Sequence, residues 1–175
     1  KALSLVNSCK KINPEIDVIA IKKKLTKEDT LSDFDIIFDC SDNLETRYLT
    51  NKIAYNSRKI LILGSATQFE GQVFVSKSGT EKNVPCYECI FPKTNELYNP
   101  NYNCRQAGII GPVTNFISSI LVTEGIRESF ILDKYYKNKF FTEKSLCSDL
   151  LMYDSTIQEL NKIKIFKNPS CSICS

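Results

Sequence analysis

Two cysteine pairs constrain the fold of this chain more than any other feature of its sequence. The pairs are Cys86-Tyr-Glu-Cys89 and Cys171-Ser-Ile-Cys174, and 81 residues lie between them. A C-x-x-C turn presents two thiolates to one tetrahedral zinc ion, and a closed structural zinc site needs four ligands. Because the chain contains no histidine, the two pairs are predicted to complete one zinc site together. The metal would then clamp the end of the chain to its middle, unless the pairs are independent redox dithiols or occur by chance.

Composition places the chain among globular proteins and excludes several functions. Of its 175 residues, 42% are hydrophobic and 25% are charged, which suits one domain with a buried core. The net charge is only +3 and comes mostly from lysine, so a dedicated nucleic-acid surface is not expected. No apolar run is long enough to span a membrane. The lack of histidine excludes Ser-His-Asp and Cys-His catalysis, and a reduced-thiol metal site favours a cytoplasmic location.

The first part of the chain alternates predicted helices with apolar, β-branched runs. Helical spacing is found over Lys1–Ile12 and Leu44–Ser57, and the runs expected to be strands are Ile16–Ile21, Asp35–Cys40 and Ile60–Leu63. Strands that alternate with helices imply crossover connections and a parallel sheet covered on both faces. The sequence therefore predicts an α/β fold with a doubly wound, mostly parallel, Rossmann-like sheet.

The second part of the chain predicts antiparallel strands and one long helix. Gln72–Ser76 alternates apolar and polar residues, as an antiparallel strand does. Leu150–Tyr153 and Glu159–Phe166 suggest a hairpin that leads into the second cysteine pair. A long apolar helix is expected over Val113–Leu132. The stretch 91–108 has no periodicity, and we expect a crossover loop there.

Acidic residues follow the predicted strand at Asp35–Cys40, where ligands bind in doubly wound sheets. A carboxylate at Asp39 or Asp42 could hold Mg²⁺ against phosphate groups, because magnesium prefers one or two carboxylates plus phosphate oxygens and water. The alternative is that Asp39 or Asp42 caps the following helix. The sequence contains no G-x-G-x-x-G fingerprint. The pattern alone therefore does not establish a nucleotide site.

Eight short segments carry a resemblance to a known family. In their order along the chain, they are KALSLVNSCKKINP, DCSDNLETRYLTN, EGQVFV, PCYECIFP, NCRQAGIIGPV, TEGIRES, LLMYD and NPSCSIC. They resemble the ThiF/MoeB/HesA family, which are bacterial relatives of ubiquitin-activating enzymes. The similarity covers essentially residues 1–175 as a single domain, and corresponds to the later and larger part of a family member. The family keeps its Gly-rich phosphate loop in the part before it.

The resemblance implies an adenylyltransferase that uses ATP to activate the C-terminal glycine of a ubiquitin-like sulfur carrier ending in Gly-Gly. It implies that Lys1 contacts the ATP phosphates and that Asp42 is catalytic, positioning Mg²⁺ and the triphosphate with Asn43 beside it. Arg47 is expected among the cofactor-binding residues. A structural role or a contact with the carrier is the alternative for it. A homodimer is also implied. The family's zinc ligands correspond to Cys86, Cys89, Cys171 and Cys174.

Cys104 is the other cysteine with a candidate role, because it lies in the predicted loop beside Arg105. A neighbouring cation lowers the pKa of a thiol, and ThiF-like members carry at this place a cysteine that links to the carrier through sulfur. Cys104 is therefore expected to be either a catalytic sulfur-relay residue or an exposed loop thiol. Cys9 and Cys40 are expected to be small buried hydrophobic residues, and Cys147 has no assigned role.

Three functions fit these observations. The first is adenylation of a sulfur carrier that serves thiamine or molybdopterin synthesis. The second is adenylation of a peptide carboxylate during the synthesis of a peptide antibiotic. The third is a truncated copy, or interaction module, that keeps the zinc clamp and the dimer surface but cannot bind ATP alone.

Overall fold

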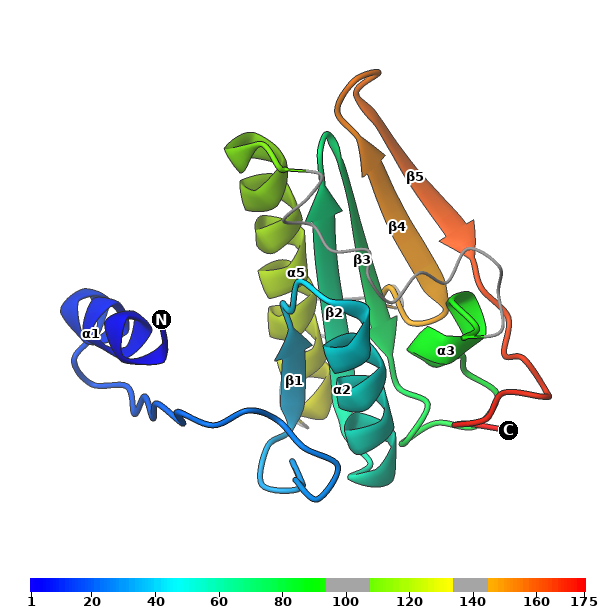
Figure 1. Cartoon of the computed structure of the whole chain (residues 1–175), viewed down its shortest axis with the longest axis horizontal. Coiled ribbons are helices and arrows are strands. Elements are labelled where there is room, and N and C mark those ends of the chain that lie inside the picture. Colours follow the sequence, from blue (N-terminus) through cyan, green and yellow to red (C-terminus); the bar gives the residue numbers. More distant parts are fainter. Residues whose placement is uncertain (94–107, 134–144) are drawn as a thin grey trace.

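The computed structural model describes residues 1–93, 108–133 and 145–175, and its centre is a five-stranded sheet (Figure 1). The strands, which lie side by side in chain order, are β1 (Ile36–Asp39), β2 (Ile60–Thr67), β3 (Glu70–Ser76), β4 (Asp149–Asp154) and β5 (Glu159–Lys164). The helices are α1 (Ala2–Ile12), α2 (Leu44–Asn56), α3 (Tyr87–Ile90) and α5 (Gly111–Leu132). Within these ranges, no helix combines the length and the apolar character that crossing a membrane requires.

The strand pairings confirm the α/β class and the antiparallel C-terminal strands. β1 and β2 pair in parallel, whereas β2–β3, β3–β4 and β4–β5 are antiparallel. Within the described residues, the expectation of a mostly parallel sheet therefore applies to the β1–β2 pair alone. The length of the connection accounts for the first two pairings. α2 provides the crossover that a parallel pair needs, whereas Gln68 and Phe69 are enough to join the antiparallel strands β2 and β3.

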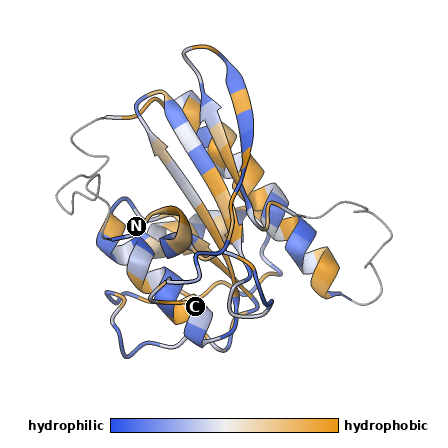
Figure 2. Ribbon diagram, turned by 90° about the vertical axis from the view of Figure 1, so that its right-hand side faces the viewer, coloured by the Kyte–Doolittle hydropathy of each residue, from blue (hydrophilic) through white to orange (hydrophobic). Residues whose placement is uncertain are grey.

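Helices cover both faces of the sheet, as the alternating pattern predicts (Figures 1 and 2). On β2, Ile60 and Ile62 belong to the buried cluster beneath α5, whereas Leu61 and Leu63 belong to the cluster beneath α2 and α3. This alternation follows from the two-residue period of a strand. The result is a three-layer arrangement in which the sheet is the middle layer.

α5 approaches the sheet closely because a glycine stands where the helix crosses β3. A Cβ atom added to Gly71 would lie 2.2 Å from Ile117 Cγ1, inside the buried core. Gly71→Ala is therefore expected to overpack this contact and to lower the free energy of unfolding by about 1–3 kcal/mol. Urea unfolding followed by circular dichroism would measure the loss. Gly111→Ala is the matched control, since nothing lies within 4 Å of its added Cβ; equal losses in both variants would contradict the packing argument.

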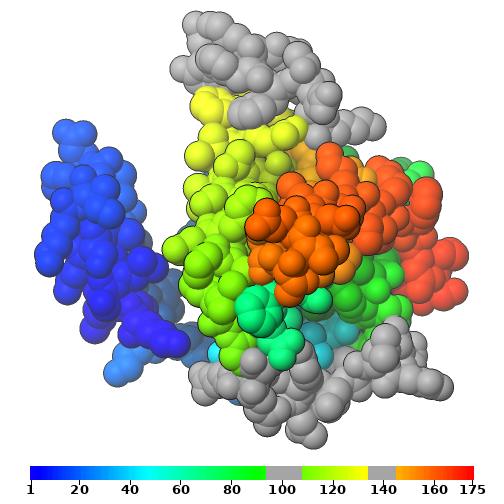
Figure 3. Space-filling view, turned by 90° about the horizontal axis from the view of Figure 1, so that it is seen from above, coloured from blue at the N-terminus to red at the C-terminus, as the bar shows by residue number. Residues whose placement is uncertain are grey.

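The segment before β1 stands apart from the sheet. α1 forms as predicted, but none of its residues is buried and it lies to one side of the other layers (Figures 1 and 3). Ile16–Ile21 is not a strand, contrary to expectation, because none of the described strands pairs with it and its isoleucines are exposed. Cys9 is only half-buried. Cys40 is exposed, so the expectation that it is buried is wrong: it follows the last residue of β1, where the chain leaves the core.

Candidate active site and metal centre

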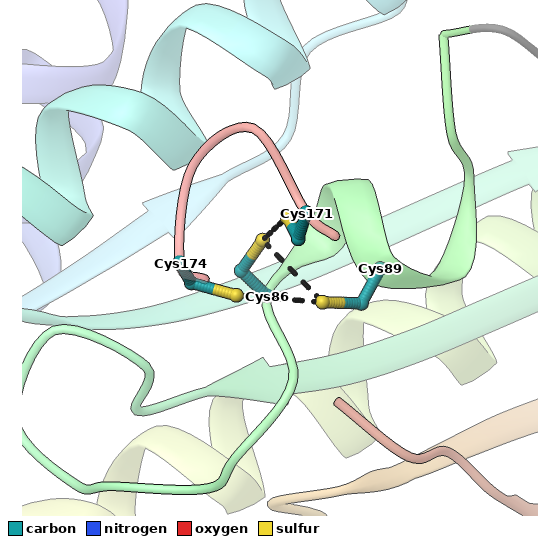
Figure 4. Close-up of side chains that lie close together, drawn as sticks. All are labelled: Cys86, Cys89, Cys171 and Cys174. Atoms are coloured by element: carbon teal, nitrogen blue, oxygen red, sulfur yellow. Dashed lines mark hydrogen bonds between the residues drawn. The ribbon is translucent and has the colours of Figure 1, made fainter. Parts of the chain in front are cut away.

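The four cysteines of the two C-x-x-C pairs lie together (Figure 4), and all four sulfur atoms are within 4.8 Å of one another. The Sγ–Sγ distance is 3.6 Å from Cys86 to Cys171, 4.0 Å from Cys86 to Cys89, and 3.4 Å from Cys89 to Cys174. Sulfur ligands about 2.3 Å from a tetrahedral zinc ion stand about 3.8 Å apart. Three of the four cysteines are buried. The cluster can therefore hold a structural zinc ion, in the arrangement that the sequence predicts.

Hydrogen bonds from distant segments hold the two cysteine pairs in place. The backbone amide of Tyr87 donates to Asn51 Oδ1 of α2 at 3.0 Å, and this buried contact anchors α3 with the first pair. The backbone amide of Asn168, in the C-terminal tail, donates to Cys89 Sγ at 3.4 Å. The tail is therefore tied to α3 by a polar contact as well as by the sulfur cluster.

The pKa values of Cys86, Cys89 and Cys174 differ from that of free cysteine. A hydrogen bond with Cys86 lowers the pKa of Cys89 to about 5, and the same interaction raises the pKa of Cys86. Burial raises the pKa of Cys174 to about 12. At neutral pH, a metal ion that binds here must displace protons from Cys86 and Cys174. Its affinity for the cluster therefore falls as the pH falls.

A cavity of about 770 Å³ lies on the face of the sheet that carries α2 and α3. Its walls come from the start of α2, the β2–β3 hairpin, the segment that follows α3, and the β4–β5 hairpin. The volume is typical of small-molecule sites. The lining includes Asp42, Asn43, Arg47, Tyr48, Ser65, Thr67, Gln72, Tyr87, Phe91, Met152, Asp154, Asn161 and Lys162.

The turn after β1 brings the predicted acidic residue to this cavity. Asp42 is exposed and lines the cavity wall. Asn43 caps α2, because its Oδ1 accepts a hydrogen bond from the Thr46 amide at 2.8 Å. Asp39 instead accepts a hydrogen bond from the Ser41 amide at 2.8 Å. The alternative that Asp39 or Asp42 caps the helix is therefore wrong, and Asp42 lines the cavity without serving as the cap.

The cavity combines an aromatic wall with charged groups. The Tyr48 hydroxyl donates to the Phe91 carbonyl oxygen at 2.6 Å, and the rings of Tyr48 and Tyr87 pack edge to face with centroids 5.3 Å apart. Burial raises the pKa of Tyr87, so its phenol stays neutral. The amino end of α2 favours anionic groups, and Asp42 can attract a divalent cation. This arrangement is suited to a polyphosphate that carries Mg²⁺.

Lys1 is predicted to contact the ATP phosphates, but the structure does not bring it to this cavity. Lys1 is exposed at the start of α1 and is not part of the lining, and Cys104 lies outside the described residues. Conversely, sequence reasoning does not single out Gln72, Met152 and Asn161, which share one rung of β3, β4 and β5 and line the cavity together. Alternation marks the two faces of each strand, but only the pairing register shows which residues share a rung.

The chain has relatives of similar sequence. It is 32% identical to the sulfur carrier protein adenylyltransferase of Thermus thermophilus and 27% identical to the molybdopterin-synthase adenylyltransferase of Salmonella typhimurium. Each alignment covers 99% of this chain, which spans 62% and 65% of the length of the two relatives.

The fold and the family also match known proteins. A crystal structure of E. coli MccB with MccA-N7isoASN has the same fold, with a TM-score of 0.73 and 18% identity over 100% of this chain and 51% of that one. The sequence matches the ThiF family over residues 1–173, which includes the turn at Asp42 and all four clustered cysteines. Because this match spans almost the whole sequence, the chain belongs to the ThiF family.

Proposed function

We propose that the complete protein adenylates the C-terminal glycine of a ubiquitin-like sulfur carrier, of the type that serves molybdopterin or thiamine synthesis. The observation that carries this proposal is the turn at Asp42, which lies with the amino end of α2 at the wall of a large cavity. The similar proteins from Thermus thermophilus and Salmonella typhimurium, which are named as adenylyltransferases, support it.

In the proposed reaction, a carboxylate oxygen of the carrier's last glycine attacks the α-phosphorus of ATP. The bond from that phosphorus to the bridging β-phosphate oxygen breaks, so an acyl-adenylate forms and pyrophosphate leaves. Magnesium, when bound, would neutralise charge on the phosphate oxygens. The amino end of α2 would orient the triphosphate, and Asp42 would hold its cation-bound form in place. The chain's task is positioning, which requires no nucleophile from the protein in this step.

Other parts of the proposal concern residues and partners around this site. Lys1 is proposed as a phosphate contact, which requires α1 to approach the cavity, and Asn43 is proposed to lie beside the triphosphate. Cys104 is proposed as the thiol that attacks the glycine carbonyl of the acyl-adenylate, so that a thioester forms, the bond to the adenylate oxygen breaks and AMP leaves. The zinc ion is proposed to have a structural role at Cys86, Cys89, Cys171 and Cys174. A cytoplasmic homodimer completes the proposal.

Exchange of labelled pyrophosphate into ATP tests this function in the complete gene product. We expect exchange that depends on a carrier, with one member of a panel of thiamine and molybdopterin sulfur carriers giving the largest rate. The matched control is the same carrier without its last glycine, which should give no exchange because the attacking carboxylate is displaced. Exchange with a short peptide but with no carrier would favour adenylation of a peptide instead. No exchange with either would contradict the proposed function.

A further inference from the structure

The backbone of Ser41, the residue immediately before Asp42, is held by side chains at both its amide and its carbonyl. Its carbonyl oxygen accepts two hydrogen bonds from Arg47, one from Nε at 3.2 Å and one from Nη2 at 2.8 Å. Its amide donates to Asp39 Oδ1 at 2.8 Å. The guanidinium donors form a rigid planar fork, so they fix the direction of the carbonyl as well as its position. These three bonds therefore determine where the backbone of Asp42 begins.

The two side chains that hold Ser41 are buried, which is unusual for charged residues. Arg47 is 8% exposed and Asp39 is 4% exposed. Burying a charge is costly unless it is paired and hydrogen-bonded. Arg47 and Asp39 are both buried and both bond to the same short turn. Their burial is therefore better explained by a role in fixing that turn than by a contribution to surface solubility.

We propose that Arg47 and Asp39 are positioning residues, which clamp the Ser41 peptide and thereby place Asp42 at the cavity wall. The clamp rests on the hydrogen bonds described above, whereas the importance of Asp42 rests on the proposed function. This role differs from the carrier or cofactor contact that the sequence suggests for Arg47. Asp39, the last residue of β1, is the second positioning residue.

A direct contact between Arg47 and the substrate is the competing explanation, because Arg47 also lines the cavity. The two roles differ in how Arg47 and Asp42 depend on each other. If Arg47 touches the phosphates, removing it costs activity whether or not Asp42 is present. If Arg47 acts by placing the Asp42 carboxylate, its removal costs nothing more once that carboxylate is gone.

A double-mutant cycle in the complete gene product separates the two roles. Arg47→Ala alone is expected to reduce carrier-dependent pyrophosphate exchange by about 10- to 100-fold, the size of a lost hydrogen bond to a charged group. Introduced into the Asp42→Asn variant, the same change should cost less than about twofold more. Lys52→Ala is the control, since Lys52 is an exposed cation of the same helix, and it should leave exchange unchanged. A further tenfold loss in the Asp42→Asn background would overturn the positioning role.

Hydrogen–deuterium exchange tests the clamp without any assumption about the reaction. Both Asp39→Ala and Arg47→Ala should speed exchange of the Ser41 amide by about tenfold or more. The first substitution frees the turn from β1, and the second frees it from α2. Arg47→Lys keeps the positive charge but loses the two-bond fork to the carbonyl oxygen, so it should give a smaller increase. This variant also keeps the test valid if the alanine variant misfolds. Zinc content and exchange across β3 should not change. An unaltered Ser41 amide in all three folded variants would refute the clamp. A confirmed clamp in a protein without pyrophosphate exchange would instead refute the proposed function alone.

Discussion

Replacing Asp42 with asparagine is expected to reduce carrier-dependent exchange of pyrophosphate into ATP on the order of 100-fold or more. The substitution keeps the shape of the side chain but removes the negative charge that would hold a magnesium-bound triphosphate. Because Asp42 is exposed on the cavity wall, the free energy of unfolding and the zinc content should stay the same. The apparent affinity for Mg²⁺, measured from exchange at increasing magnesium concentrations, should fall together with the rate.

Glu45→Gln is the matched control for this experiment. Glu45 is exposed in the first turn of α2, three residues beyond Asp42, and does not line the cavity. Its substitution removes the same charge from the same end of the helix. A general electrostatic effect of α2 would therefore reduce exchange equally in both variants. That outcome, or full exchange by the Asp42→Asn protein, would remove Asp42 from the mechanism.

Replacing Cys171 with serine is expected to abolish zinc binding. Wild-type protein purified without added zinc should contain about one zinc ion per chain, and the variant close to none. Cys171 is buried among the other sulfurs, so its loss leaves the site open and removes the metal anchor of the tail. We expect the free energy of unfolding to fall by at least about 3 kcal/mol, which lowers the melting temperature by about 10 °C in a chain of this size. Metal analysis and thermal unfolding would measure these two effects.

The damage should be confined to the region of the cluster. The two large hydrophobic clusters on the faces of the sheet contain no cysteine, so the sheet should stay folded. Limited proteolysis should therefore cut the variant first in the tail that follows β5. Cys9→Ser is the control, because it changes a thiol on α1 and should leave zinc content and melting temperature unchanged. Wild-type protein with intact thiols and no zinc would contradict the metal site.

Features that depend on spacing along the chain could be predicted from the sequence. The predicted helix Leu44–Ser57 differs from α2 by one residue, and Val113–Leu132 differs from α5 by two. The cysteine pairs were predictable as one cluster, because a tetrahedral metal needs four ligands and the chain offers no histidine. Asp42 was predictable as a candidate because it follows an apolar strand.

Features that depend on pairing in space could not be predicted. Ile16–Ile21 has the composition of a strand, but a strand requires a partner, and composition does not supply one. The helix cap illustrates the same limit on a smaller scale. Ser41, Asp42 and Asn43 are all good capping residues, and only the path of the backbone selects Asn43. The clamp on Ser41 was hidden as well, since the sequence does not show that the Arg47 side chain turns back toward the preceding turn.

The sulfur cluster has a consequence for the order in which the protein assembles. Cys89 and Cys171 enclose α5, β4 and β5 between them, so a metal bridge turns this part of the polypeptide into a closed ring. Closing this ring in a disordered chain costs about 4 kcal/mol of chain entropy, most of which the folded strands remove in advance. We therefore expect the pairing of β3 with β4 to come first, since it carries the tail toward α3. Zinc capture would then be a late event, which locks an assembled sheet and does not nucleate it.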